Sequence, residues 1–253
     1  MRGGIIQVLK KYPHIHKLMQ FVYWKVREAK ARILGTKIEE KKWSKMHLNK
    51  GEGWIRECWE SKRNPHRQFV LSHIVRYAPF TTVLKVGCNY GPNLYNIAKF
   101  FPDVEARGVD INPVVVEKGN GFFADERMTN VRLSVGVADD LSEFGNRIFD
   151  IVLTDAGLLY IGPDKILKVI RELFRVARRS LILVEWHCGL NESDPVGLGI
   201  YYKGYWKRNY LKLLRPFANE ECISLTKIPE EIWPTEGWKH FGYVIEVNLQ
   251  PYF

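Results

Sequence analysis

The 253-residue chain is 46% hydrophobic and 26% charged, an ordinary composition for a soluble protein, and it is long enough for one large α/β domain with a small appendage. It contains no run of 18 apolar residues, which excludes a membrane-spanning helix, and the short apolar patch at its start predicts no secretory signal peptide. The four cysteines lie far apart and form no CxxC pair. That spacing argues against structural zinc and a disulfide framework, and it fits a reducing cytoplasm.

The net charge of +10 belongs to one end of the chain. Residues 1–50 hold 13 lysines and arginines against 3 glutamates, whereas the remainder holds 25 basic and 25 acidic residues. This asymmetry predicts two parts, a basic helical extension with a linker at residues 1–53 and an electrically neutral domain at residues 54–253.

The extension is predicted to contain an amphipathic helix over residues 14–34, because apolar side chains recur there at helical spacing while the basic ones fall largely on other faces. The apolar positions are Ile15, Leu18, Met19, Val22, Val26, Ala29 and Ile33. Residues 35–53, with three glycines among charges, predict a linker, and residues 54–77 predict a second helix.

From Thr82 onward, strands alternate with helices. Strands are predicted at 82–87, 105–110, 131–137, 149–155 and 180–187, and helices at 92–101, 113–123 and 163–178. After a loop rich in Gly and Pro, the pattern predicts a helix near 204–215 and two final strands, 221–228 and 241–249, joined by a hairpin-like closure. The alternation predicts an α/β fold with a Rossmann-like, mostly parallel sheet and helices on both faces.

The stretch VLKVGCNYGPN, residues 83–93, leads from a strand through a tight turn into a helix. Its spacing is G-x-N-x-G, over Gly87, Asn89 and Gly91, so it lacks the further glycines with which a dinucleotide loop approaches a pyrophosphate. It also lacks the G-K-[ST] of a Walker loop. Asparagine tolerates the left-handed conformation that such a turn requires. The loop therefore predicts a ligand without phosphates.

Carboxylates follow the ends of the next three strands. Asp110 stands about twenty residues after the loop, where a carboxylate accepts hydrogen bonds from a ribose diol. Asp139 and Asp140 follow the third strand, and Asp155 ends the fourth. Because the carboxyl ends of parallel strands meet at one rim, these acids, with no basic loop beside them, predict a cationic nucleoside such as S-adenosylmethionine.

With these motifs in order, the stretch from Thr82 to Val247 resembles the class I S-adenosylmethionine-dependent methyltransferases. The resemblance implies seven strands, with the last antiparallel and inserted beside the fifth. It implies the following cofactor contacts: Gly87, Asn89 and Gly91 around the methionine part, Asp110 on the ribose, Ala138 and Asp139 beside the adenine, and Asp155 near the methionine end or the substrate. Stretches such as LLYIGPDKILKVIRELFRVARRSLILVEWH and YWKRNYLKLL also resemble uncharacterised methyltransferases of surface-polysaccharide and glycolipid synthesis.

Two residues depart from the family pattern. Lys85 stands where the family usually has an acid that helps to hold the cofactor's ammonium, so it either repels the cofactor, snorkels, or pairs with an acid such as Asp155. Val137 stands where an acid often lies beside the adenine, which leaves Asp139 or Asp140 to substitute. These departures keep a degenerate, non-catalytic scaffold as an alternative to an enzyme.

The fifth strand ends in VEWH, where alternation puts Glu185 and His187 on one side. His187 is predicted to be the general base for a hydroxyl acceptor, with a plain hydrogen bond to loop backbone as the alternative. A divalent metal held by Asp155, Glu185 and His187 is a less favoured alternative, so no metal is predicted.

The acceptor pocket is predicted to include Tyr160, Tyr201 and Tyr202, unless these rings only pack, while His66 and His73 are predicted to be structural or part of a lid. The fourth strand is not followed by [DN]-P-P-[YFW], and there is no Pro-Cys pair, which disfavours methylation of nucleic acid bases. The favoured acceptor is an oxygen on a small or lipid-linked molecule.

Three roles compete for the basic extension. An apolar face flanked by lysines and arginines suits an anionic membrane surface, which would bring a cytoplasmic enzyme to a lipid-linked acceptor. Basic patches with Tyr23 and Trp24 suit RNA binding, although the regular helical spacing argues against it. The third role is a lid helix packed on the domain, with its charges in solvent.

Overall fold

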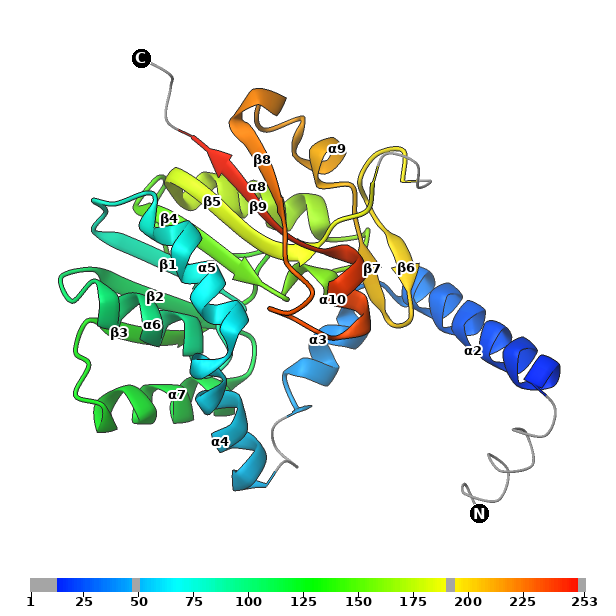
Figure 1. Ribbon diagram of the computed structural model, residues 1–253, viewed down its shortest axis with the longest axis horizontal. Coiled ribbons are helices and arrows are strands. Elements are labelled where there is room, and N and C mark those ends of the chain that lie inside the picture. Colours follow the sequence, from blue (N-terminus) through cyan, green and yellow to red (C-terminus); the bar gives the residue numbers. More distant parts are fainter. Residues whose placement is uncertain (1–12, 47–50, 190–193, 250–253) are drawn as a thin grey trace.

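The computed structural model describes residues 13–46, 51–189 and 194–249 (Figure 1). A seven-stranded sheet forms its centre, in the order β3-β2-β1-β4-β5-β9-β8. The strands are β1 (Thr82–Val86), β2 (Glu105–Asp110), β3 (Val131–Val135), β4 (Phe149–Asp155), β5 (Ala177–Trp186), β8 (Ile223–Lys227) and β9 (Gly242–Asn248). Neighbouring strands among β1 to β5 pair in parallel, and β9 runs antiparallel between β5 and β8. The sheet predicted from the family resemblance is confirmed.

Helices cover both faces of the sheet (Figure 1). The cluster on one face contains α4 (Glu52–Glu60), α5 (Pro65–Val75), α6 (Pro92–Phe100), α7 (Pro113–Asp125) and α10 (Glu236–Phe241). The other contains α8 (Ile166–Val176) and α9 (Tyr210–Leu214). All seven residues of β4 are buried, as expected for a strand covered on both sides. The two apolar layers hold the carboxyl ends of the central strands at one rim.

Two sequence predictions were wrong in local detail. The helix expected over 54–77 is broken, because Pro65 begins α5 and Asn64 before it is extended; the 3₁₀ turn η2 (Ser61–Arg63) fills the break. The helix expected near 204–215 is the hairpin β6 (Ile200–Tyr202) and β7 (Tyr205–Lys207), followed by the short α9. The hairpin-like closure predicted at the sheet edge is confirmed, because β8 and β9 pair antiparallel and β8 is the edge strand; α10 lies in the connection between them. In the two wrong predictions, a Pro or tertiary pairing overrides the helical periodicity.

The predicted linker over 35–53 contains α3 (Lys37–Trp43), which follows α2 (Pro13–Leu34) after a turn at Gly35. Thr36 ties this turn to the domain: its backbone N–H donates to Asp164 Oδ2 at 2.9 Å, its hydroxyl donates to Asp164 Oδ1 at 2.7 Å, and the same hydroxyl accepts from the N–H of Gly162. At the other end, Asn112 Nδ2 donates to the carbonyl of Trp43 at 2.8 Å. The helix α3 is therefore part of the folded domain.

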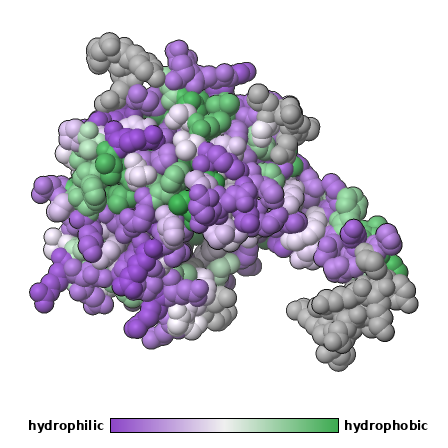
Figure 2. All heavy atoms as spheres, in the orientation of Figure 1, coloured by the Kyte–Doolittle hydropathy of each residue, from purple (hydrophilic) through white to green (hydrophobic). Residues whose placement is uncertain are grey.

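The amphipathic helix predicted over 14–34 is confirmed, but its apolar face is exposed. Figure 1 shows α2 projecting from the body, and Figure 2 shows hydrophobic atoms among hydrophilic ones along it. Leu18 and Val26 are each 62% exposed and Ile33 is 80% exposed. The contacts with the body come from another face of α2, where Arg32 lies over the Trp206 ring and Trp24 lies near Gly204. The lid-helix alternative does not account for this exposed face.

Within residues 13–46, 51–189 and 194–249, no helix is both long enough and apolar enough to cross a membrane. The four cysteines all lie in the described ranges, and none of them is in a disulfide bond. The prediction that no signal peptide is present concerns residues 1–12, which lie outside the described ranges.

Candidate active site

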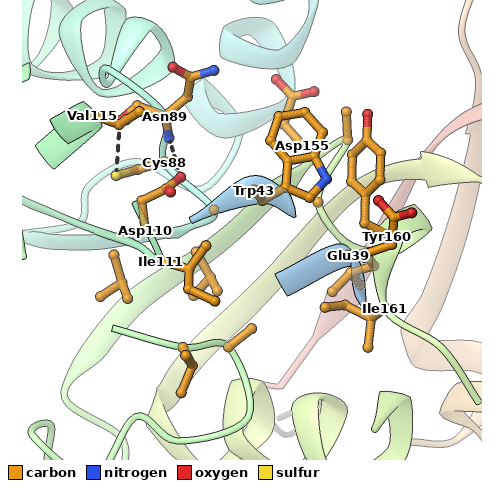
Figure 3. Close-up of a pocket in the computed structure, with 18 of the residues that line it drawn as sticks. Glu39, Trp43, Cys88, Asn89, Asp110, Ile111, Val115, Asp155, Tyr160 and Ile161 are labelled. Carbon is orange, nitrogen blue, oxygen red and sulfur yellow. Dashed lines mark hydrogen bonds between the residues drawn. The ribbon is translucent and has the colours of Figure 1, made fainter. Parts of the chain in front are cut away.

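A cavity of about 450 Å³ opens at the carboxyl ends of β1, β2 and β4 (Figure 3). Its walls come from the loop after β1, the turns after β2 and β3, the end of β4, the start of α5 and, unexpectedly, α3. Figure 3 shows Trp43 of α3 between the Asp110 side and the Tyr160 side of the cavity. This is the rim where open α/β sheets bind their ligands.

The turn after β1 has the left-handed backbone that its sequence predicts. Gly87, Asn89 and Gly91 have φ angles of 66°, 53° and 86°. A Cβ atom on Gly91 would lie 2.6 Å from the Phe123 ring, so only glycine fits there without a shift. Gly87 and Asn89 line the cavity, whereas Gly91 shapes the turn from behind.

Asp110 connects the end of β2 to this turn. Its Oδ2 accepts the N–H of Asn89 at 2.8 Å, and its Oδ1 accepts the N–H of Asn112 at 3.0 Å. Burial raises the pKa of Asp110, although these backbone N–H groups act in the opposite direction. Asp110 lines the cavity and could accept further hydrogen bonds from a diol, since each oxygen has two lone pairs.

Asp155 at the end of β4 is buried and paired. Its Oδ2 accepts from the Arg67 guanidinium and from Asn93 Nδ2, the latter at 2.7 Å. Burial acts to raise the pKa of Asp155, but the positive charges of Arg67 and Lys85 outweigh it and hold that pKa below the usual value. Among the described residues, its second oxygen, Oδ1, is buried with no hydrogen-bond partner.

Asp139 also lines the cavity, but two lysines of the α8 region engage it: Lys165 at 3.3 Å and Lys168 at 3.2 Å. Lys165 also pairs with Glu40 of α3 at 2.5 Å. Asp140 is exposed, so Asp139 is the one of the two that faces inward. The sequence predicted acids with no basic loop beside them at this rim. Basic side chains nevertheless pair with Asp139 and Asp155. These basic side chains come from helical regions that the strand-end motifs do not include.

Lys85 lies beneath the turn, outside the described cavity lining. It is 2% exposed, and its ammonium donates to the carbonyl of Gly87 at 3.0 Å. Burial lowers the pKa of Lys85, while the nearby Asp155 charge acts to raise it. Of the three alternatives for Lys85, a direct pair with Asp155 is not formed, because the described partners of that carboxylate are Arg67 and Asn93; the Lys85 and Asp155 charges still influence each other's pKa.

Glu185 and His187 lie outside the described cavity lining. Glu185 accepts the backbone N–H groups of Gly157, Leu158 and Leu159, and burial raises the pKa of Glu185 to about 7. His187 is buried, and its Nδ1 accepts the N–H of Tyr210 at 3.2 Å. The His187 ring also packs edge-on against the Tyr243 ring. A catalytic role for Glu185 and His187 stays a prediction.

Of the three predicted acceptor-pocket tyrosines, Tyr160 lines the cavity. Tyr201 packs on Trp206 near α2, and Tyr202 packs on Trp186 and Phe241, outside the described lining. In the described part of the chain, no group of three His, Cys, Asp or Glu residues could hold a metal ion.

Several lining residues escaped the sequence reasoning. They are Thr36, Glu39, Glu40 and Trp43 around α3, Arg67 at the start of α5, and Trp233 before α10. His66, predicted to be structural or part of a lid, also lines the cavity. The Asn-Pro pair at 64–65 signals the helix start that carries His66 and Arg67. For Trp43 and Trp233 the sequence holds no comparable signal.

Residues 83–180 match the family described as a methyltransferase domain. This segment is a methyltransferase domain. It spans β1 to the first part of β5 and carries the turn after β1, Asp110, Asp139 and Asp155. The resemblance to class I S-adenosylmethionine-dependent methyltransferases is therefore confirmed, while the finer likeness to polysaccharide and glycolipid enzymes stays a prediction.

One curated protein is similar to this chain over more than half of its length. An uncharacterised protein of Rickettsia prowazekii (strain Madrid E) is 32% identical over 153 residues, which are 57% of this chain and 61% of that protein. The chain thus spans about three fifths of that relative.

Two solved structures share the fold. One is geranyl diphosphate C-methyltransferase from Streptomyces coelicolor A3(2), in complex with Mg²⁺, geranyl diphosphate and S-adenosyl-L-homocysteine, with TM-score 0.55, 15% identity, and 72% of this chain and 78% of that chain covered. The other is the [4+2]-cyclase SpnF, with TM-score 0.55, 17% identity, and 72% and 80% covered. At these identities the likeness concerns the fold, and the cyclase bears out that one fold hosts different reactions.

Proposed function

We propose that this protein is an S-adenosylmethionine-dependent methyltransferase that methylates an oxygen of a small or lipid-linked, saccharide-type acceptor at an anionic membrane surface. The main support is the cavity at the carboxyl ends of β1, β2 and β4, where a methyltransferase domain presents the half-buried Asp110 and the buried Asp155 on either side of a left-handed turn. Both carboxylates have hydrogen-bonding capacity that a cationic nucleoside would use.

The lining chemistry fits S-adenosylmethionine part by part. The apolar residues at one end suit a flat adenine ring: Val109, Ile111, Val137, Ala138, Leu158 and Ile161. Asp110 suits the ribose hydroxyls. The unpaired Asp155 Oδ1 suits the ammonium, and the Arg67 guanidinium suits the carboxylate of the methionine part. When bound, the cofactor would supply a methyl group on a positively charged sulfur.

The contribution of the chain is then alignment and exclusion of water. The turn after β1 and Asp110 would fix the cofactor, α3 would cover it with Trp43, and Tyr160 would limit the approach of the acceptor. Alignment of this kind is worth several kcal/mol of activation free energy.

The exposed face of α2 supports the membrane part of the proposal. Apolar side chains at the water interface, flanked by Lys17, Lys25 and Lys30, match a surface of anionic lipid head groups. A lipid-linked acceptor would be presented at the same surface. Oxygen as the target atom rests on the absence of the base-methylation motifs.

A second candidate is a domain of this fold that binds the cofactor without transferring its methyl group. Two observations support this second candidate: a [4+2]-cyclase has the same fold, and Lys85 stands where the family usually has an acid.

Titration calorimetry with S-adenosylmethionine and S-adenosylhomocysteine tests the proposal. We expect both to bind the wild type, and Asp110→Asn to weaken binding by about tenfold or more because a charged hydrogen-bond acceptor is lost. Asp103→Asn, on an exposed turn, is the matched control and should bind as the wild type does. No binding at about 1 mM, a concentration that detects even affinities near −4 kcal/mol, would sink the proposal. Tight binding with no methyl transfer to any hydroxyl acceptor would favour the second candidate.

A further inference from the structure

One end of the cavity gathers buried polar atoms that lack partners. Among the described residues, these atoms are His66 Nε2, Arg67 Nε, Asp155 Oδ1 and Trp43 Nε1. All four residues line the same cavity, although they come from α5, β4 and α3. An unpaired buried polar group costs about 1–3 kcal/mol, so such atoms indicate a ligand that pairs them. The methionine part of the cofactor would pair Asp155 Oδ1 and Arg67, which leaves His66 Nε2 for a second ligand.

Of these four atoms, His66 Nε2 belongs to an aromatic ring that stacking holds in one orientation. The imidazole is stacked on the Trp233 indole, with 4.0 Å between centroids and 21° between planes. Trp233 is stacked in turn on Trp238, at 3.6 Å and 5°. The start of α5 at Pro65 holds the backbone of His66. This column of rings fixes the imidazole, so Nε2 has one orientation toward its surroundings.

Flat aromatic side chains also line this cavity. Trp233 comes from the connection after β8, and Tyr160 comes from the 3₁₀ turn η3 (Leu158–Tyr160) after β4. Trp43 meets Tyr160 edge-on, with 4.6 Å between centroids. Aromatic walls with one fixed hydrogen-bond acceptor suit a ring-shaped ligand that carries a hydroxyl group.

We propose that this end of the cavity is the acceptor subsite, in which His66 Nε2 takes the proton of a ring-borne hydroxyl group while Trp233 and Tyr160 flank the ring. The proposal rests on the proposed function, and it gives to His66 the role that the sequence predicts for His187. His187 Nδ1 already accepts from the backbone of Tyr210, and its side chain lies outside the described lining.

The charge state of His66 agrees with this role. Burial lowers the pKa of His66 to about 4; the Asp155 carboxylate acts to raise that pKa and the Arg67 guanidinium acts to lower it. The imidazole is therefore neutral at neutral pH. With its proton on Nδ1, the Nε2 lone pair is free to accept.

The step balances without any further reagent. The acceptor oxygen forms a bond to the methyl carbon as the carbon–sulfur bond breaks and leaves its electron pair on sulfur. The O–H proton passes to His66 Nε2. Because the imidazolium has a pKa of about 4, it gives the proton to water at neutral pH, and the site is ready for the next turnover.

The test uses the full chain with S-adenosylmethionine and two hydroxyl probes, methyl β-D-glucopyranoside and 4-nitrophenol, with the methyl ether measured by mass spectrometry. We expect the wild type to methylate at least one probe, and His66→Gln to lower kcat by about 10²- to 10⁴-fold while the affinity for S-adenosylmethionine stays within about threefold. The control His240→Gln changes an exposed histidine and should match the wild type. Trp233→Leu should raise KM for the probe more than it lowers kcat.

The pH profile separates the two histidines. With His66 as the base, kcat/KM of the wild type should be level from about pH 5.5 to 8, whereas a base with the ordinary histidine pKa would make it fall below about pH 6.5. A histidine ¹⁵N spectrum of the protein saturated with S-adenosylhomocysteine should show His66 Nε2 shifting when a probe binds.

Wild-type activity in His66→Gln, a fall of the rate near pH 6.5, or cofactor binding with no probe methylated and no shift at His66 would each overturn the acceptor subsite and leave the proposed function standing. A wild type that fails to bind the cofactor would overturn the proposed function itself.

Discussion

Lys85 illustrates how much a residue's meaning depends on where its side chain lies. In the sequence it replaces an acid at the cofactor loop. In the structure its ammonium supports the loop from below by donating to the carbonyl of Gly87, and Asp155 and Arg67 are close enough to influence its pKa. The positive charge is therefore part of a buried group of charges, and Lys85 is not among the residues described as lining the cavity.

We expect Lys85→Glu to weaken the fold and not to tighten cofactor binding. The substitution would bury a second carboxylate near Asp155 and leave the Gly87 carbonyl unpaired, which should cost about 3 kcal/mol of unfolding free energy. Lys99→Glu, on the exposed end of α6, is the control of equal charge change. Denaturant unfolding and calorimetry measure the two effects. Tighter binding of S-adenosylmethionine by Lys85→Glu would mean that Lys85 impairs the site.

Glu185 and Arg208 clamp the loop after β4 from two sides. Glu185 accepts three backbone N–H groups of residues 157–159, and Arg208 donates to the carbonyls of Leu158 and Ile161. Both side chains are fully buried. Because this loop carries Leu158, Tyr160 and Ile161 into the cavity, the clamp positions part of the cavity wall.

The stability of this clamp should depend on pH. The folded pKa of Glu185, about 7, lies above the ordinary value of 4.5, so the folded state binds more protons than the unfolded state between those values. The unfolding free energy of the wild type, measured relative to Glu185→Gln, should therefore fall by up to about 3 kcal/mol as pH rises from 4.5 to 7, and then level off. Urea unfolding across this range measures it, with the exposed Glu117→Gln as control. A difference that rises with pH would contradict the raised pKa of the buried Glu185 carboxyl group.

At the scale of elements, α2 and α3 differ in what holds them. The turn and the end of α3 are bonded to the domain through Thr36 and Trp43, and its side chains line the cavity. The helix α2 contacts the body through one face and leaves Leu18, Val22 and Val26 in solvent. An exposed apolar stripe of this kind usually marks an interaction surface.

We expect the protein to cosediment with vesicles containing about 30% phosphatidylserine at low salt and not with phosphatidylcholine vesicles, because each basic residue near an anionic surface contributes about 1 kcal/mol. Salt near 1 M should release it, since the Debye length falls to about 3 Å. The double variant Leu18→Asp, Val26→Asp should bind at least about tenfold more weakly.

Val196→Asp, at an exposed apolar position outside α2, should bind the vesicles as the wild type does. Equal binding by the α2 variant and this control would show that the apolar face plays no part. Salt-sensitive RNA binding without vesicle binding would favour the RNA alternative.

At the scale of the molecule, the charge boundary near residue 53 does not coincide with the boundary of the site. Glu39, Glu40 and Trp43 belong to the basic extension, yet they line the cavity together with Asp110 and Asp155 of the neutral domain. The predicted division into 1–53 and 54–253 therefore describes the charge, while the cavity uses both parts. The extension carries an exposed amphipathic helix at one end and residues that line the cavity at the other. It would therefore connect a surface with the site.

The sequence was sufficient wherever the signal is local. The bounds predicted for β2 and β4 agree with the structure, as do the left-handed Asn89 and the rim carboxylates Asp110 and Asp155. Hydrophobic periodicity, turn chemistry and the parallel-sheet rule act over a few residues or over one topology, so they can be applied to the chain as written.

Tertiary structure alone decided which distant residues meet. It paired Asp155 with Arg67, turned Lys85 beneath the loop, left His187 bonded to backbone and brought His66 to Trp233. The last two residues are 167 positions apart, and no local pattern carries information about that distance. These contacts follow from how helices pack on a finished sheet, which is why the fold and the carboxylates at the strand ends were readable from the sequence, whereas the contact between His66 and Trp233 was not.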